Sequence, residues 1–117
     1  MWDLANVKIY LAAGATDMRK SILGLSYIVE QVYEQDPSDR NLYLFCNGDR
    51  TRLKILQYDV NGYCLYYKRL DTGRFAWPRH EQDETIELSE QELMWLLHGV
   101  HLVGIQEGKT QALKSAY

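Results

Sequence analysis

The 117-residue chain has few cysteines and no long apolar run, the features that mark disulfide-rich and membrane proteins. Its two cysteines, Cys46 and Cys64, lie inside expected strands rather than in a spaced disulfide framework. Reduced core thiols in a cytosolic protein are the favoured interpretation, and a disulfide between neighbouring strands stays open as the alternative. The N-terminal segment MWDLANVKIYLAAG has no basic stretch, and its apolar run is too short for a bilayer, so we expect a cytoplasmic protein without an export or membrane signal.

Positive charge and catalytic motifs are also scarce. The chain has 13 Lys and Arg against 16 Asp and Glu, a formal net charge of −3, which argues against a surface that attracts polyanions everywhere. It contains no glycine-rich phosphate loop and no nucleophile elbow. A nucleic-acid function would therefore depend on a local concentration of basic residues.

The first third of the chain predicts one strand and one helix. Residues 7–11 alternate between apolar and polar positions, as in a strand. Thr16 or Asp17 is then the expected N-cap of an amphipathic helix of about sixteen residues that ends before Pro37. Arg19 and Lys20 at its start are candidate phosphate contacts, although Asp17 as a cap would itself occupy the free amides. The apolar stripe of this helix consists of Met18, Ile22, Leu25, Val29 and Val32.

Residues 41–79 read as a sheet of four strands. Asn47-Gly48, Asn61-Gly62 and the turn at residues 71–73 recur at hairpin spacing, which favours an antiparallel meander over parallel βαβ units. The expected strands are 42–46, 49–58, 63–70 and 74–78. The stretch from residue 40 to 79 is rich in cations, which are Arg40, Arg50, Arg52, Lys54, Lys68, Arg69, Arg74 and Arg79.

Strand alternation assigns the cations to faces. Arg50, Arg52 and Lys54 should point to one side of their strand, because side chains alternate with a period of two. This basic row is the first candidate for DNA contact, since such groups neutralise phosphates and neighbouring rings can stack on bases. Alternatively, the basic row is only the solvent-exposed outer face of a half-buried sheet and binds no partner. The cations expected near the row are Lys68, Arg69, Arg74 and Arg79, and the candidate rings are Tyr63, Tyr67, Phe75 and Trp77.

An acidic run and a short apolar helix follow the sheet. Ser89 and Glu92 form a capping-box pattern ahead of the helix, and Gly99 suits the left-handed position after it. The acidic run has two interpretations. It is a solubilising linker, or it shields the basic sheet or docks a basic partner, with Glu84 and Glu87 as the candidate docking residues. Trp95 is expected in the core, or in a partner-binding patch if it is not covered. Residues 101–105 predict a last short strand.

Metal and catalytic sites have weak support in the sequence. His98 and His101 lie three residues apart, but the pair straddles the expected helix end and has no third ligand in register. Asp59 and Asp71 occupy turn positions where aspartate is common, so with Asp17 they make a poor two-metal site. We therefore expect no metal site, no cofactor and no catalytic residues.

The elements together predict one α+β domain over residues 1–105 and a polar tail over residues 106–117. The domain should contain an N-terminal strand, a long helix, a four-stranded antiparallel meander and a short C-terminal buried helix with a closing strand. Both helices are expected on one face of the sheet.

Several ordered segments resemble one protein family. These are TDMRKS at residues 16–21, Leu53-Lys54, GYCLYYKRL at 62–70, GRFAWP at 73–78 and WLLHGVHL at 95–102. They resemble the small accessory protein, TnpB or the second open-reading-frame protein, of the insertion-sequence sixty-six family of bacterial mobile elements. The resemblance covers residues 7–102.

The resemblance implies a helper of DNA transposition and recombination that is encoded beside a separate transposase. Strand cleavage then falls to the larger partner, so the chain is expected not to be an enzyme. DNA, the transposase and the element's other accessory protein are the implied partners. The leading mechanism is DNA contact through the basic sheet. Its alternative is an adaptor that binds the transposase without touching DNA, and a catalytic subunit with an unrecognised metal site is a third.

Overall fold

The computed structural model describes residues 4–78, 84–102 and 113–115. This part of the chain contains two helices and seven strands, and a π-helical turn, η1, extends the first helix. The elements are β1 (Ile9–Ala12), α1 (Ile22–Tyr27), η1 (Ile28–Val32), β2 (Leu42–Cys46), β3 (Arg52–Asp59), β4 (Gly62–Arg69), β5 (Thr85–Leu88), α2 (Glu90–Leu97), β6 (Val100–Leu102) and β7 (Leu113–Ser115).

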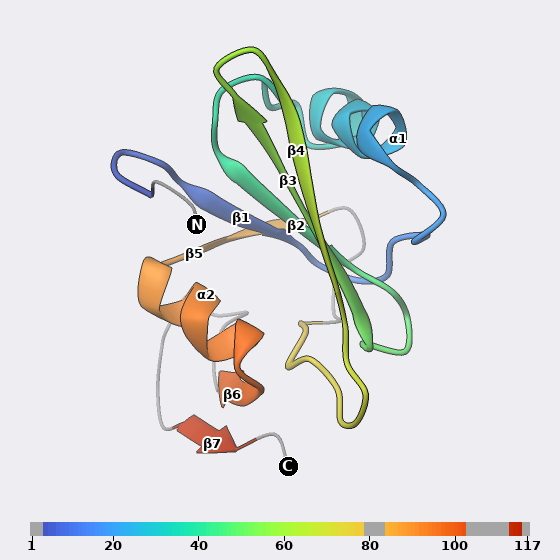
Figure 1. Cartoon of the computed structure of the whole chain (residues 1–117), viewed down its shortest axis with the longest axis vertical. Helices are drawn as coiled ribbons and strands as arrows, with labels where there is room; N and C mark the ends of the chain where they lie inside the picture. Colours follow the sequence, from blue (N-terminus) through green and yellow to red (C-terminus); the bar gives the residue numbers. More distant parts are fainter. Residues whose placement is uncertain (1–3, 79–83, 103–112, 116–117) are drawn as a thin grey trace.

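Five strands form a mixed sheet in the order β4-β3-β2-β1-β5 (Figure 1). The pairs β2–β3 and β3–β4 are antiparallel hairpins, as expected, and β1 and β5 also pair antiparallel. Strands β1 and β2 are parallel, with Ile9 opposite Leu42, and α1 lies in the connection between them. The α+β class is confirmed, and the sheet also contains one parallel crossover between β1 and β2, outside the stretch for which the sequence favoured hairpins.

The fourth strand of the expected meander does not form. Residues 74–78 alternate like a strand, but they form none, and both rings, Phe75 and Trp77, are buried in the core on the α2 side of the sheet. The Phe75 amide donates to the Arg50 carbonyl oxygen at 2.7 Å, and Trp77 Nε1 donates to the Ala12 carbonyl oxygen at 2.9 Å. The second sheet edge is taken by β5, which arises inside the acidic run that the sequence analysis treated as a linker.

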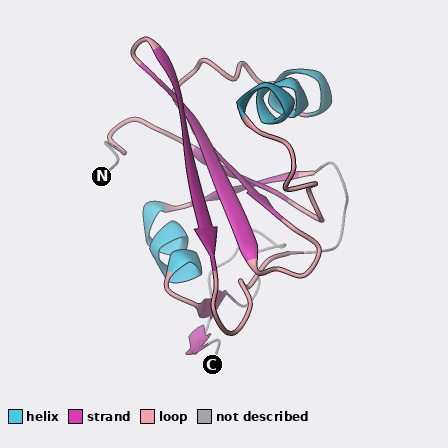
Figure 2. Ribbon diagram, turned by 45° about the vertical axis from the view of Figure 1, so that its right-hand side comes forward, coloured by secondary structure: helices cyan, strands magenta, loops and turns pink. Residues whose placement is uncertain are grey.

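The two helices lie on opposite faces of the sheet, so the prediction of a single covered face is wrong (Figure 2). Tyr43 and Phe45 of β2 face α1, where they pack with Leu25 and Val29. The alternate β2 residues face α2, and these are Leu42, Leu44 and Cys46. Every β2 residue is buried, so the central strand needs cover on both sides.

Helix α1 starts later than its apolar stripe predicts. Its N-cap is Ser21, which makes no side-chain cap hydrogen bond, and neither Thr16 nor Asp17 occupies the position. Asp17 instead closes a turn ahead of the helix by accepting from the Arg19 amide at 2.9 Å. The helix ends in η1, where the Tyr33 amide reaches the Ile28 carbonyl oxygen at 3.1 Å.

The hairpin turns lie where the sequence places them, but their backbone differs. The left-handed residues are Arg50, with φ of 61°, and Val60, with φ of 51°, whereas Gly48 and Gly62 have ordinary φ values. A non-glycine residue in this region is uncommon, and a β-branched one such as Val60 is an outlier.

The C-terminal elements follow the sequence closely up to residue 102. The Glu92 amide donates to Ser89 Oγ at 3.0 Å, and the Ser89 amide donates to Glu92 Oε1 at 2.8 Å, so the capping box is confirmed. Gly99 follows α2 with φ of 78°, as predicted. Strands β6 and β7 pair antiparallel, and β7 lies inside the segment predicted as a tail. The division of the chain at residue 105 stays a prediction. No helix among the described residues has the length and apolar character needed to span a membrane.

Candidate nucleic-acid interface

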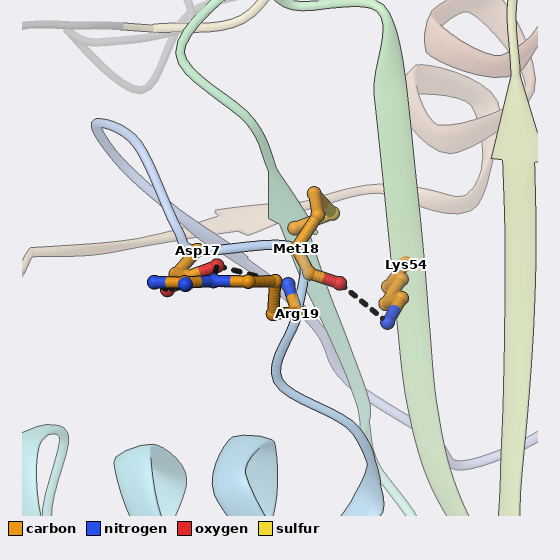
Figure 3. A network of polar contacts seen from close by, with 4 residues as sticks. All are labelled: Asp17, Met18, Arg19 and Lys54. Atoms are coloured by element: carbon orange, nitrogen blue, oxygen red, sulfur yellow. Dashed lines mark hydrogen bonds and ion pairs between the residues drawn. The ribbon is translucent and has the colours of Figure 1, made fainter.

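Lys54, the end of the predicted basic row, is bound into the fold. Its Nζ donates to the Met18 carbonyl oxygen at 2.9 Å (Figure 3). It also donates to the Lys20 carbonyl oxygen at 2.7 Å and lies 5.7 Å from the centroid of the Tyr67 ring. The ammonium group thus ties the segment before α1 to the middle of β3. With its donors directed at backbone carbonyls, Lys54 is a structural residue more than a phosphate contact.

Lys68 is likewise occupied, on the opposite face. Its Nζ donates to the Leu97 carbonyl oxygen at 2.8 Å. That carbonyl belongs to the last residue of α2, where a cation is favoured by the partial negative charge of the helix end. Lys68 therefore fixes α2 against β4.

Arg19 forms an ion pair with Asp17 close to the contact between Lys54 and Met18 (Figure 3). Arg19 Nη2 and Asp17 Oδ2 are 2.7 Å apart, and Arg19 Nε also donates to the carboxylate. The hydrogen bonds from Arg19 lower the pKa of Asp17 from 3.8 to about 2. Both side chains are well exposed, so this pair orders a surface turn and leaves Arg19 only partly available to an outside anion.

Arg50 does not lie in a row with Arg52 and Lys54, because β3 begins only at Arg52. It sits in the turn between β2 and β3 in a left-handed conformation. Its Nε is buried and has no hydrogen-bond acceptor among the described residues. An unsatisfied buried donor costs about 1–3 kcal/mol. Arg79, the last predicted contact, lies outside the described residues.

Arg52 and Arg69 are the cations that the fold leaves facing each other. They are cross-strand partners on β3 and β4, both exposed. The next pair, Thr51 and Leu70, is joined by a backbone hydrogen bond, so Arg52 and Arg69 form a non-hydrogen-bonded pair, with Cα atoms about 4.5 Å apart. Like charges directly opposite each other destabilise a sheet. Neither arginine forms an ion pair within the described part of the chain.

Two further cations extend this pair. Lys20 is exposed next to Arg19, and its own carbonyl oxygen is held by Lys54, two residues from Arg52 on the same face. Arg74 is exposed in the loop after β4. We call Lys20, Arg52, Arg69 and Arg74 the basic corner.

Only one of the predicted stacking rings is well placed for a ligand. Tyr67 lies on the same face as Arg69 and is 50% exposed. Tyr63 is partly buried and packs edge-on against Tyr58, with ring centroids 5.1 Å apart. Phe75 and Trp77 are 1% and 4% exposed, so they are core residues and not platforms for bases.

The acidic residues lie at the other side of the sheet. Glu84 and Glu87 are exposed at β5, which is the edge opposite β4. At about 4.8 Å between strands, the four intervals from β4 to β5 span about 19 Å, roughly twice the screening length at 0.1 M salt. The described acids of β5 therefore do not neutralise the basic corner. Glu81 and Asp83 lie outside the described residues.

The other candidate groups are dispersed. Trp95 of α2 is partly buried and packs against the core on that face. His98 is exposed after α2, while the side chain of His101 is outside the described part of the chain. Across residues 4–78, 84–102 and 113–115, no three metal-ligating side chains cluster. Cys46 and Cys64 are both free thiols, and Cys64 is exposed, contrary to the expectation of two core thiols.

An open hollow lies beside the basic corner, and the sequence did not predict it. It has a volume of about 600 Å³ and is lined by residues 50–51 and 70–75. The turn at residues 71–73 was predicted, but its approach to the turn before β3 depends on the path of the chain after β4. The only sequence signal was the repeated occurrence of arginine, at Arg50 and Arg74, next to turn residues.

Comparison with known proteins places the chain among relatives of similar length. It matches the family model described as IS66 Orf2 like protein over residues 7–107. Two proteins of Sinorhizobium fredii are similar to it. Uncharacterized protein y4hO is 40% identical over 95 residues, covering 81% of this chain and 82% of the relative. Uncharacterized protein y4jC is 27% identical over 94 residues, covering 80% of each. No solved structure matches.

The family match includes every segment on which the resemblance was based, from the turn at Asp17 to the end of β6. It also includes all four residues of the basic corner. The chain therefore belongs to the IS66 Orf2-like family, and this membership implies an accessory role in transposition.

Proposed function

We propose that the protein is a non-enzymatic accessory of transposition that contacts DNA through the basic corner. The observation that carries the proposal is the cross-strand pair of Arg52 and Arg69, two exposed arginines opposite each other with no ion-pair partner in the described part of the chain. Such a pair is unfavourable in the free protein, and a bound phosphate would turn the repulsion into attraction.

The chemistry of the corner suits a DNA backbone. Arginine presents a planar fork that binds phosphate oxygens in pairs, and Lys20 adds a mobile point charge. Tyr67 offers a half-exposed ring two residues from Arg69, on which an unpaired base could stack. These contacts would position a strand and would carry no sequence information by themselves.

The acidic edge would orient the protein on DNA. The chain has a net negative charge, so DNA is not attracted to its surface as a whole. With Glu84 and Glu87 at the β5 edge and Arg52 and Arg69 on β3 and β4, the β4 side would attract a phosphate backbone more strongly than the β5 side.

The salt dependence of DNA binding tests the proposal. A corner that neutralises four phosphates should give a slope near −3.6 in log affinity against log salt, a loss of about 150-fold between 50 and 200 mM. The double variant Arg52→Gln/Arg69→Gln should reduce the slope to about −1.8. A shallow slope in the unmodified protein, or an unchanged slope in the double variant, would refute DNA contact at this corner.

A matched control removes the same charge from elsewhere. Lys8 and Arg40 are exposed near the other end of the sheet, where Ile9 pairs with Leu42. Lys8→Gln/Arg40→Gln changes the net charge as the test variant does, and the backbone hydrogen bonds of both residues remain. The slope should stay near −3.6 in this control.

The adaptor function is the second candidate, and the exposure of Glu84 and Glu87 on the free edge strand β5 favours it. A basic surface of the element's transposase would dock there, next to the partly buried Trp95. Co-purification with the transposase, compared between the unmodified protein and Glu84→Gln/Glu87→Gln, tests this function. Retained association in the variant would exclude docking through these acids.

A further inference from the structure

The hollow beside the basic corner has walls that the backbone holds in place. The Arg50 amide donates to the Asn47 carbonyl oxygen at 3.1 Å, and the Arg50 carbonyl oxygen accepts from the Phe75 amide at 2.7 Å. The Leu70 amide adds a bond to the Thr51 carbonyl oxygen at 2.9 Å. The turn before β3 and the loop after β4 are therefore tied together, and the space between them is formed before any ligand arrives.

Arg50 carries two unfavourable features in one residue. Its backbone is left-handed, a conformation in which glycine or asparagine would be more stable. Its Nε is also buried without an acceptor in the described part of the chain. Both features persist at a residue that lines an open hollow. Backbone strain clusters at functional sites, and an unsatisfied buried donor in a folded protein calls for an explanation.

The lining of the hollow selects an anion. Arg50 and Arg74 supply guanidinium groups, and Thr51 and Thr72 supply hydroxyl groups. Asp71 also belongs to the lining and opposes an anion, but it is exposed and thus well solvated. The volume of about 600 Å³ lies in the range of small-molecule sites and leaves room for more than an inorganic ion.

We propose that this hollow binds a nucleotide phosphate, either the terminal phosphate of a DNA strand or that of a free nucleotide, with Arg50 as its main donor. The inference rests on the proposed function, because a strand held by the basic corner would bring its end to the neighbouring hollow. The guanidinium group of Arg50 would bind the phosphate, and a turn of this side chain toward the hollow would take Nε out of the buried position in which it has no acceptor.

Two variants of Arg50 isolate its side chain from its backbone. Arg50→Gly removes the guanidinium group and suits the observed φ of 61°, so the turn and the backbone bond to Phe75 should survive. Arg50→Lys keeps the charge and removes the fork. Thermal unfolding should show that both variants fold.

The experiment compares one short duplex with a 5′-phosphate or a 5′-hydroxyl end by fluorescence anisotropy, and titrates deoxyadenosine monophosphate by calorimetry. A charge-assisted hydrogen bond predicts about tenfold tighter binding of the phosphorylated duplex. Arg50→Gly should abolish this difference and leave the affinity for the hydroxyl duplex within about twofold, and Arg50→Lys should be intermediate.

The outcomes separate this site from the basic corner. Arg52→Gln/Arg69→Gln should weaken both duplexes alike and keep their ratio. If only the mononucleotide binds, and Arg50→Gly loses it, the site stands with a free nucleotide as its ligand, even if no DNA is bound. If neither probe distinguishes the unmodified protein from Arg50→Gly, the site is refuted while DNA contact at the basic corner can still hold.

Discussion

The two edges of the sheet carry opposite charge, and they differ in how that charge is satisfied. At the acidic edge, Glu90 and Glu92 lie in the first turn of α2, where a negative charge is favoured, and Glu92 completes the capping box. At the basic edge, Arg52 and Arg69 face each other without an ion-pair partner in the described part of the chain. Glu90 and Glu92 therefore have a structural reason to be there, and the two arginines have none within the described part of the chain.

The basic edge is itself divided. Lys54 and Arg52 lie on the same face of β3, two residues apart, yet Lys54 binds two carbonyl oxygens and Arg52 binds none. Lys68 and Arg69 repeat this division on β4, since Lys68 holds the end of α2. Charge on this hairpin thus separates into cations that build the fold and cations that remain for a partner.

Removing Lys54 should have the largest effect on stability. Lys54→Met keeps the length of the side chain and loses two charge-assisted hydrogen bonds to the segment before α1. We expect the free energy of unfolding to fall by about 2 kcal/mol, measured by urea denaturation. Arg52→Met is the matched control and should change it by less than about 0.5 kcal/mol. An equal fall in the free energy of unfolding in both variants would show that Lys54 contributes no more to the stability of the fold than Arg52.

Removing Lys68 should have a smaller effect, confined to the other face. Lys68→Met leaves the Leu97 carbonyl oxygen without its charged donor, so we expect a loss of about 1 kcal/mol. Hydrogen exchange should show faster opening of the last turn of α2. Arg69→Met, one residue along, should leave α2 protection unchanged, and faster exchange there would contradict the role given to Lys68.

These lysines also show where inference from the sequence ends. The sequence could predict the capping box of Ser89 and Glu92, because its partners are three residues apart. Strand alternation could place Lys54 on the face opposite Leu53, but its acceptors lie 34 and 36 residues away, and that of Lys68 lies 29 away. Only the path of the chain brings such groups together, so the three residues of the basic row and their neighbours Lys68 and Arg69 became two structural lysines, a turn residue and two arginines without an ion pair in the described part of the chain.

The same limit explains the errors in the fold. Phe75 and Trp77 alternate with polar residues as a strand would, yet their rings fill the core below the sheet. The edge strand beside β1 is β5, which the sequence did not predict. Its Ile86 and Leu88 supply the apolar alternation in an otherwise acidic run. The fully apolar β2 did carry a usable signal, because a strand buried on both faces requires a layer on each side.

Reversing one charge of the arginine pair should have a modest effect in two opposite directions. Arg52→Glu places a carboxylate across from Arg69, so repulsion becomes attraction and the free energy of unfolding should rise by about 0.5 kcal/mol. DNA affinity should fall at the same time, since a phosphate contact is replaced by a repelling charge. Thermal unfolding and anisotropy on one preparation check both. A variant that is less stable than the unmodified protein would show that the arginines do not repel each other.

The smallest expected effect concerns Asp17, whose pKa of about 2 reflects the hydrogen bonds from Arg19. The pKa in the folded state is below the ordinary aspartate value of 3.8, so the contribution to stability is present above about pH 3.8 and is lost as the pH falls through about 2. Arg19→Gln should return the carboxyl pKa toward 3.8, measured by NMR titration of the Asp17 side chain. Lys20→Gln is the control and should shift it less, because Lys20 acts on Asp17 only through space while Arg19 donates directly. Equal shifts in the two variants would mean that general positive charge, and not the ion pair, holds this turn ahead of α1, and Arg19 would then be as available to an outside phosphate as Lys20.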